Sequence, residues 1–229
     1  MSQRFVLQAM PGGKRSDRIS KRDLEILEFI ARFGVVPRSA VATWAGTGRT
    51  VTITRERRLR EAGLIEVSPG IGGGDRLLIC TRLGLRVVGR TDLRLAQLSL
   101  QRVTHESVVA LLAAGLERAG DRTLSEREIL ARERAAGERV FSAALSRGRF
   151  HRADLLRVDS QDGEMEAVEV ELTTKGASRL DELLRAWRRA VAEQRVKRVV
   201  YRCSPAARPY VERAVERTRT SAAIGVDEL

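Results

Sequence analysis

Apolar residues in the first helix-forming stretch of the sequence follow the period of an α-helix. They fall at i, i+3, i+4 and i+7, which is the spacing of one buried helical face. These positions are Ile26, Phe29, Ile30 and Phe33. Ser20 lies before this stripe with Asp23 three residues later, a pattern that predicts a capping box at the start of the helix. Gly34 predicts its end.

Two further helices and a β-hairpin are predicted in the next fifty residues. Pro37 is suited to open the second helix, and the third is expected from Arg49 to Ala62. A strand at 64–67, a glycine-rich loop at 68–75 and a returning strand at 76–80 follow. Three helices followed by a hairpin is the plan of a winged helix-turn-helix, whose third helix enters the major groove of DNA.

The rest of the chain alternates helical and strand-like patterns, so the expected fold class is α+β, with a winged helix-turn-helix before a second α/β domain. A helical connector is expected over 92–119, with an apolar face wide enough to pack within the chain or against a second copy in a homodimer. The later elements are a helix opened by Ser125, strands at 140–145, 154–158, 166–172 and 196–203, and helices at 178–193 and 209–219. The predicted domains are a basic arm (1–18), a winged helix (19–90), a connector (91–120), a second domain (121–220) and a tail (221–229).

Charge is distributed unevenly along the chain. The net charge is +12, but residues 1–90 contain 17 Lys and Arg against 8 Asp and Glu. That part therefore holds +9, and residues 91–229 hold only +3. Concentrated positive charge favours a polyanionic partner, and double-stranded DNA is the one that fits a winged helix. The alternative is a generally basic protein with an arginine-rich composition.

The third predicted helix and the hairpin supply the side chains expected to contact DNA. Guanidinium groups and hydroxyls are the donors that phosphates and base edges accept. The candidates are Arg49, Thr50, Thr52, Arg55, Arg57, Arg58, Arg60 and Arg76. A winged helix that contacts protein instead of DNA is the alternative, and the charge of +9 argues against it.

A second candidate site lies in the predicted hairpin of residues 151–175. Strand alternation would place Glu169, Glu171 and Lys175 on one face, near Asp154 at the start of the partner strand. Carboxylates grouped in this way can hold a hard cation such as Mg²⁺. An edge hairpin with one solvated acidic face is the alternative interpretation.

Some classes of protein are disfavoured by the sequence. No apolar run approaches the length of about 18 residues that a membrane span needs, and the N-terminus lacks the apolar region of a signal peptide. Cys80 and Cys203 are too far apart in sequence to form a ligand-spaced cluster, so buried thiols are expected. We therefore expect a cytoplasmic protein associated with the nucleoid.

The second domain resembles the restriction-endonuclease-like, or PD-(D/E)XK, fold. Together with the preceding winged helix, the residues Asp154, Glu169, Glu171 and Lys175 make the chain similar to the replication-relaxation family of plasmids and mobile elements. The resemblance implies that Asp154 and Glu169 take the two acid positions, with Ala153 in place of the motif's proline. The motif's lysine position holds Glu171, and Lys175 lies two alternations further along the same face.

Two functions follow from this resemblance. In the first, the chain is a DNA-binding regulator of transcription or replication on a plasmid, phage or integrative element, and its nuclease-like domain is degenerate. In the second, it is a Mg²⁺-dependent endonuclease in which Asp154, Glu169 and Glu171 hold the metal and Lys175 assists catalysis. We favour binding over cleavage because Glu171 occupies the lysine position. A scaffold that recruits replication or transfer proteins is a third interpretation.

Overall fold

The computed structural model describes residues 19–161, 163–174 and 176–229. The predicted basic arm (1–18) and Lys175 lie outside the described residues. The chain divides into two compact units, Met1–Ala114 and Gly115–Leu229, and each is described by itself. The boundary between the units falls within the helix α5 (Val103–Arg118). The predicted connector (91–120) is therefore shared between the two units and does not form a separate part of the fold.

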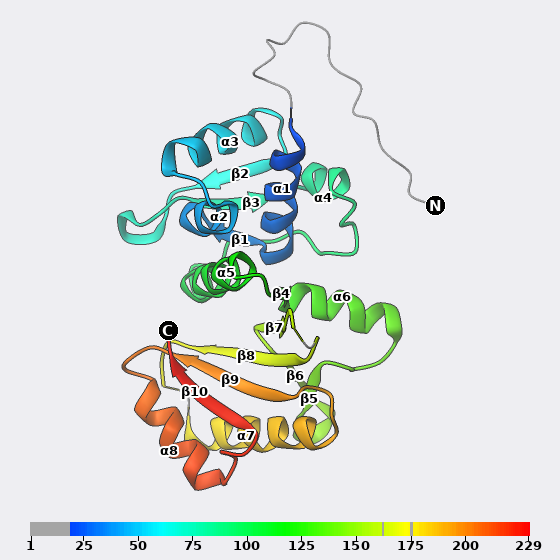
Figure 1. Cartoon of the computed structure of the whole chain (residues 1–229), viewed down its shortest axis with the longest axis vertical. Helices are drawn as coiled ribbons and strands as arrows, with labels where there is room; N and C mark the ends of the chain where they lie inside the picture. The colour runs from blue at the N-terminus through cyan, green and yellow to red at the C-terminus, as the bar shows by residue number, and fades with distance from the viewer. Residues whose placement is uncertain (1–18, 162, 175) are drawn as a thin grey trace, which may run out of the picture. The chain divides into compact units, whose positions relative to one another are not determined.

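The first unit has the order of elements of a winged helix-turn-helix, as predicted (Figure 1). Its elements are α1 (Lys21–Phe33), β1 (Val35–Pro37), α2 (Arg38–Ala45), α3 (Arg49–Glu61), β2 (Ile65–Ser68), β3 (Leu77–Cys80) and α4 (Arg82–Val87). The strand β3 pairs antiparallel with both β1 and β2. The strand β1 was not predicted, since two valines before a proline are too short a run to stand out from a helix connection.

The helix α1 forms for the reasons that its sequence indicates. The Ser20 hydroxyl accepts a hydrogen bond from the backbone N–H of Asp23, and the Asp23 carboxylate accepts one from the backbone N–H of Ser20. This is the predicted capping box. Gly34 ends the helix with a φ of 83°, a conformation that favours glycine. The apolar stripe is buried in the core of the unit at Ile26, Leu27, Phe29 and Ile30.

The loop between β2 and β3, residues 69–76, is called the wing below. It is held closed by a close backbone approach, because a Cβ added at Gly70 would lie 2.1 Å from the carbonyl oxygen of Asp75. The Asp75 carboxylate accepts a hydrogen bond from the backbone N–H of Ser39 in the first turn of α2. The first contact closes the wing on itself, and the second holds it against α2.

The predicted helix over 92–119 is wrong in its first third, since α5 begins only at Val103. Residues 91–102 have no regular helix. Their leucines are spaced by two, three and two residues, which does not keep one helical face. Leu93 is buried, whereas Leu95, Leu98 and Leu100 are exposed.

The second unit is built on a five-stranded mixed sheet in the order β10-β9-β8-β7-β4. The pairs β4–β7 and β7–β8 are antiparallel, whereas β8–β9 and β9–β10 are parallel. Its strands are β4 (Arg122–Ser125), β7 (Leu155–Val158), β8 (Met165–Glu171), β9 (Arg198–Cys203) and β10 (Ile224–Glu228). The other elements are α6 (Glu126–Ala136), β5 (Ser142–Ala144), β6 (Phe150–Arg152), α7 (Ala177–Ala192) and α8 (Arg208–Thr218).

Two predictions about this sheet are wrong. The stretch 140–145 was expected to be its first strand, but β5 pairs with β6 in a separate two-stranded sheet. The first strand is β4, which has little apolar character and runs directly into the cap of α6. Residues 221–229 were expected to be a tail, whereas β10 pairs with β9 along its whole length.

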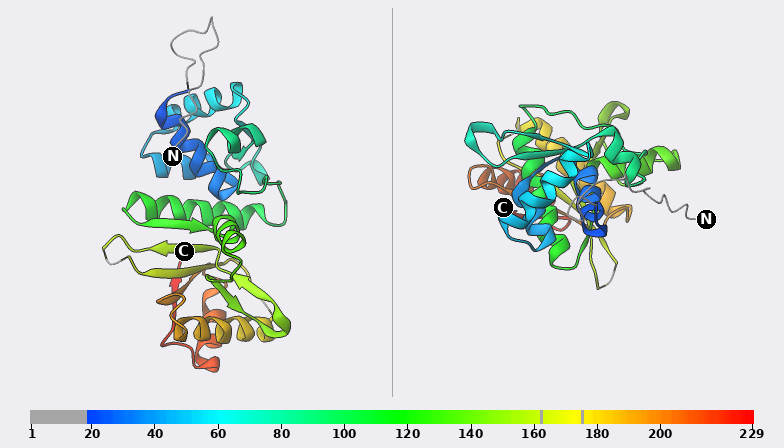
Figure 2. Two further views of the ribbon diagram at one scale, coloured as in Figure 1. Left: turned by 90° about the vertical axis from the view of Figure 1, so that its right-hand side faces the viewer. Right: turned by 90° about the horizontal axis from the view of Figure 1, so that it is seen from above.

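The helices α7 and α8 pack on one face of the sheet (Figures 1 and 2). Leu180, Leu184 and Trp187 of α7 belong to the same core as Ala167 and Tyr201 of the sheet.

The predicted fold class, α+β with a winged helix before a second α/β part, is confirmed. Both cysteines are buried, as expected, and neither forms a disulfide within the described residues. No helix in the described part of the chain combines the length and apolarity needed to span a bilayer.

Candidate functional site

The helix α3 turns one narrow face toward the core of the first unit. Thr52, Glu56 and Leu59 are buried, at the spacing of one helical face. Thr52 is 1% exposed, and its hydroxyl donates a hydrogen bond to the carbonyl oxygen of Gly48. Thr52 was predicted to contact DNA, but its side chain lies on the inner side of α3, where its hydroxyl bonds the backbone carbonyl four residues earlier.

A buried ion pair joins α3 to α2. The guanidinium of Arg38 donates to both carboxylate oxygens of Glu56, with N···O distances of 2.6 and 3.0 Å. The two residues are 8% and 7% exposed. The Glu56 hydrogen bond raises the pKa of Arg38 above its ordinary value. Two parallel hydrogen bonds fix direction as well as distance, so this pair sets how α3 lies against α2.

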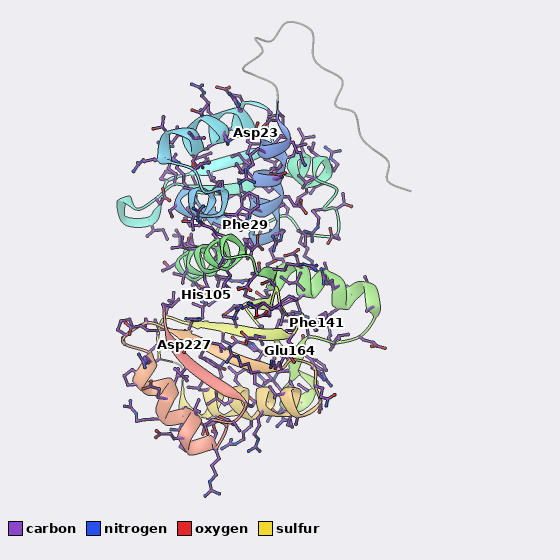
Figure 3. All side chains as sticks on the ribbon, in the orientation of Figure 1. Asp23, Phe29, His105, Phe141, Glu164 and Asp227 are labelled. Carbon is purple, nitrogen blue, oxygen red and sulfur yellow. The ribbon has the colours of Figure 1, made fainter. Side chains whose placement is uncertain are left out.

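A second ion pair joins α3 to α1. Arg55 donates to Asp23 at 2.8 Å, and Asp23 is fully buried. Burial raises the pKa of Asp23, but hydrogen bonds from Ser20 and Arg55 outweigh it, so this pKa lies below its ordinary value. Asp23 is labelled in Figure 3. Arg55 was predicted to contact DNA, but its guanidinium group forms an ion pair with Asp23 inside the unit.

The other predicted contacts of α3 and the wing lie at the surface. Arg49, Thr50, Arg57, Arg60 and Arg76 are exposed, and Arg58 is half-buried. Within the described ranges, none of these five arginines forms an ion pair. A shallow hollow of about 660 Å³ lies between the start of α2, the start of α3 and the wing. Arg49 of α3 and Arg76 of the wing line it, together with the Asp75 carboxylate, which accepts hydrogen bonds from the backbone N–H groups of Ser39 and Arg76.

The predicted acidic site of the second unit draws its carboxylates from β8 and from the turn before β7. Glu169 and Glu171 share the face of β8 that also carries Ala167, and this face packs against α7. They are 2% and 4% exposed. The alternative of a solvated acidic face is therefore wrong, because β8 is the central strand of the sheet. Asp154 accepts a hydrogen bond from the backbone N–H of Val170 at 2.8 Å.

The Glu169 carboxylate is held by two side chains that the sequence analysis did not select. Its Oε1 lies 2.7 Å from Nε2 of His151 and accepts a hydrogen bond from Nε1 of Trp187 at 2.9 Å. The two rings meet edge to face, with centroids 6.0 Å apart. A histidine three residues before Asp154 was a usable signal, but the contact with Trp187 depends on how α7 crosses the sheet.

Tyr201 lies beside this group on the neighbouring strand. Its backbone pairs with Glu169 in the β8–β9 ladder, and its side chain is 1% exposed. The phenol oxygen has no hydrogen-bond partner within residues 19–161, 163–174 and 176–229. Burial, and then the charges of Glu169, Glu171 and Asp154, raise the pKa of Tyr201 well above its ordinary value.

The proposed metal ligands lie just before β7 (Asp154) and on β8 (Glu169 and Glu171), but Asp154 and Glu169 each already accept a hydrogen bond from the protein. In the described part of the chain, no group of three or more His, Cys, Asp or Glu side chains has the geometry to hold a metal ion. The predicted catalytic Lys175 lies outside the described residues.

These contacts predict different changes in stability when each of two buried aromatic residues, Trp187 and Tyr201, is replaced by phenylalanine. Trp187→Phe is expected to destabilise the second unit by at least about 1.5 kcal/mol, because the buried Glu169 carboxyl loses a donor and the smaller ring leaves a cavity in the core. Tyr201→Phe is expected to change the free energy of unfolding by less than about 0.5 kcal/mol, or to stabilise, since the hydroxyl makes no hydrogen bond with described residues. Chemical denaturation followed by circular dichroism measures both variants. A greater loss in Tyr201→Phe would contradict this assignment of contacts.

A comparison of the chain with protein-family models and with curated proteins finds no match.

Proposed function

We propose that this protein is a double-stranded DNA-binding regulator that contacts the duplex through α3 and the wing. The observation that supports this most is a division among the arginines of the first unit. Arg38 and Arg55 are neutralised by internal carboxylates. Arg49, Arg57, Arg60 and Arg76 are exposed, and none has an ion-pair partner among the described residues. Positive charge that is unpaired within the described residues attracts a negatively charged partner such as DNA.

The chemistry of these side chains fits a duplex. An arginine fork can donate two hydrogen bonds to the major-groove edge of guanine or to a phosphate. A helix of 13 residues with a wing beside it matches the way in which helix-turn-helix proteins place a recognition helix in the major groove. The resemblance described above favours control of transcription or replication on a plasmid, phage or integrative element. A homodimer on a palindromic site is part of this proposal.

DNA cleavage with Mg²⁺ is the second candidate function, and its support is that Asp154, Glu169 and Glu171 lie on one part of the sheet. Among the described residues, these carboxylates do not form a group with the geometry of a metal site. The first function is preferred for two reasons. Glu171 stands where the resemblance implies a lysine, and one oxygen of Glu169 is occupied by His151 and Trp187.

One experiment separates the two functions. The full chain is incubated with supercoiled plasmid in the presence of Mg²⁺, Mn²⁺ or EDTA, and both retardation and nicking are measured. Retardation of intact plasmid in every condition is the expected result. Nicking that requires the metal and is lost in Asp154→Ala would establish the second function. No retardation in any condition would contradict the proposal.

A further inference from the structure

Two apolar side chains of α3 are exposed among its arginines and threonines. Val51 is 46% and Ile53 is 39% exposed, whereas the core contacts of this helix are made by other residues. Branching at Cβ lowers the helix propensity of both residues. Neither the packing of the unit nor the stability of the helix therefore accounts for them.

Ile53 lies in line with two of the exposed arginines. Residues four apart are neighbours on a helix surface, so Ile53 is flanked by Arg49 on one side and Arg57 on the other. Arg49 also lines the hollow that the wing borders. Arg49, Ile53 and Arg57 therefore form one exposed row along α3, and the first member of this row lines the hollow beside the wing.

Val51 lies on a different side of the same helix. Its neighbour four residues later is Arg55, which is paired with Asp23 of α1. Val51 is similar to Ile53 in size, branching and exposure, but it lies on the side of α3 that carries the Arg55 contact with α1, away from the row of Arg49, Ile53 and Arg57. This difference makes it a matched control.

We propose that Ile53 contacts the methyl group of a thymine in the major groove, so that the preferred DNA site contains an A·T pair at that position. The C5-methyl of thymine is the apolar group that a base pair presents in the major groove. An apolar side chain between two arginines would bury this methyl group while the guanidinium groups bind neighbouring phosphates or guanines. The inference rests on the proposed function and adds base specificity to it.

The test replaces single thymines by deoxyuridine, which removes only the methyl group. Duplexes are first enriched from a randomised pool with the full chain, and each thymine of an enriched duplex is then replaced in turn. At one position the affinity of the wild-type chain is expected to fall about fourfold, which is the contribution of one buried methyl group. Ile53→Ala is expected to abolish this difference, and Val51→Ala is expected to keep it.

The outcomes distinguish this inference from the function on which it rests. If enriched duplexes bind but no deoxyuridine lowers the affinity, or if Ile53→Ala keeps the full difference, Ile53 does not contact a thymine methyl and DNA binding still stands. If no duplex is enriched or retained, both the inference and the proposed function are overturned.

Discussion

Replacing Arg49 and Arg57 together by alanine is expected to weaken duplex binding on the order of thirtyfold or more. Each arginine is exposed, and neither has an ion-pair partner among the described residues, so each is available to a base edge or a phosphate. One such contact contributes about 1–3 kcal/mol, and two contacts at separate positions combine approximately additively. Fluorescence anisotropy with a labelled enriched duplex measures the affinity of each variant.

A matched control shows whether the effect depends on position or only on charge. Arg82 and Arg86 of α4 are also exposed, and they too form no ion pair within the described residues. Arg82→Ala with Arg86→Ala removes the same charge from the same unit. We expect this variant to lose less than about threefold in affinity, through long-range electrostatics alone. Equal losses in the two double variants would contradict a specific role for α3.

The second large effect is expected from the buried ion pair between α2 and α3. Glu56→Ala leaves the Arg38 guanidinium buried without its partner. Loss of one member of a buried pair typically costs about 3–5 kcal/mol. The first unit should therefore unfold more readily, and the amides of α2 and α3 should exchange faster with deuterium. Hydrogen exchange resolved by peptide measures this unit separately from the second one.

Two further variants test the physical cause of this effect. Glu61→Ala removes an exposed carboxylate from the same helix and is expected to change stability by less than about 0.5 kcal/mol. Arg38→Met with Glu56→Leu removes both charges and is expected to recover most of the lost protection, because no unpaired charge stays buried. Exchange in Glu56→Ala that matches the wild type would show that the pair does not hold α3 in place.

The helices of the first unit could be predicted because their signals are local. The capping box of Ser20 and Asp23, the glycine at position 34 and the apolar stripe of α1 all act within a few residues of one another. The phase of α3 was harder to predict. Arg55 and Glu56 are charged residues that form ion pairs inside the unit, with Asp23 and Arg38 respectively. A partner 18 or more residues away leaves no periodic signal.

In the second unit, too, the features that depend on contacts between residues distant in sequence were not predicted. The hairpin β7–β8 and the helix α7 follow from alternation and from a strong amphipathic pattern. The edge strands β4 and β10 were not predicted. Each is stabilised by backbone hydrogen bonds to a strand that is distant in sequence, and such pairing leaves no local pattern. Burial of Glu169 could not be predicted either, because its two partners come from other elements, His151 from β6 and Trp187 from α7.

The salt dependence of duplex binding tests the central claim most directly. If α3 and the wing bind the DNA backbone through arginines, the logarithm of the affinity of the wild-type chain should fall linearly with the logarithm of salt concentration, by about 0.9 per phosphate contacted. The slope of the Arg49→Ala and Arg57→Ala double variant should be smaller by about one for each phosphate contact removed. Binding that does not change with salt, or a slope that is the same in the wild type and the double variant, would contradict this account.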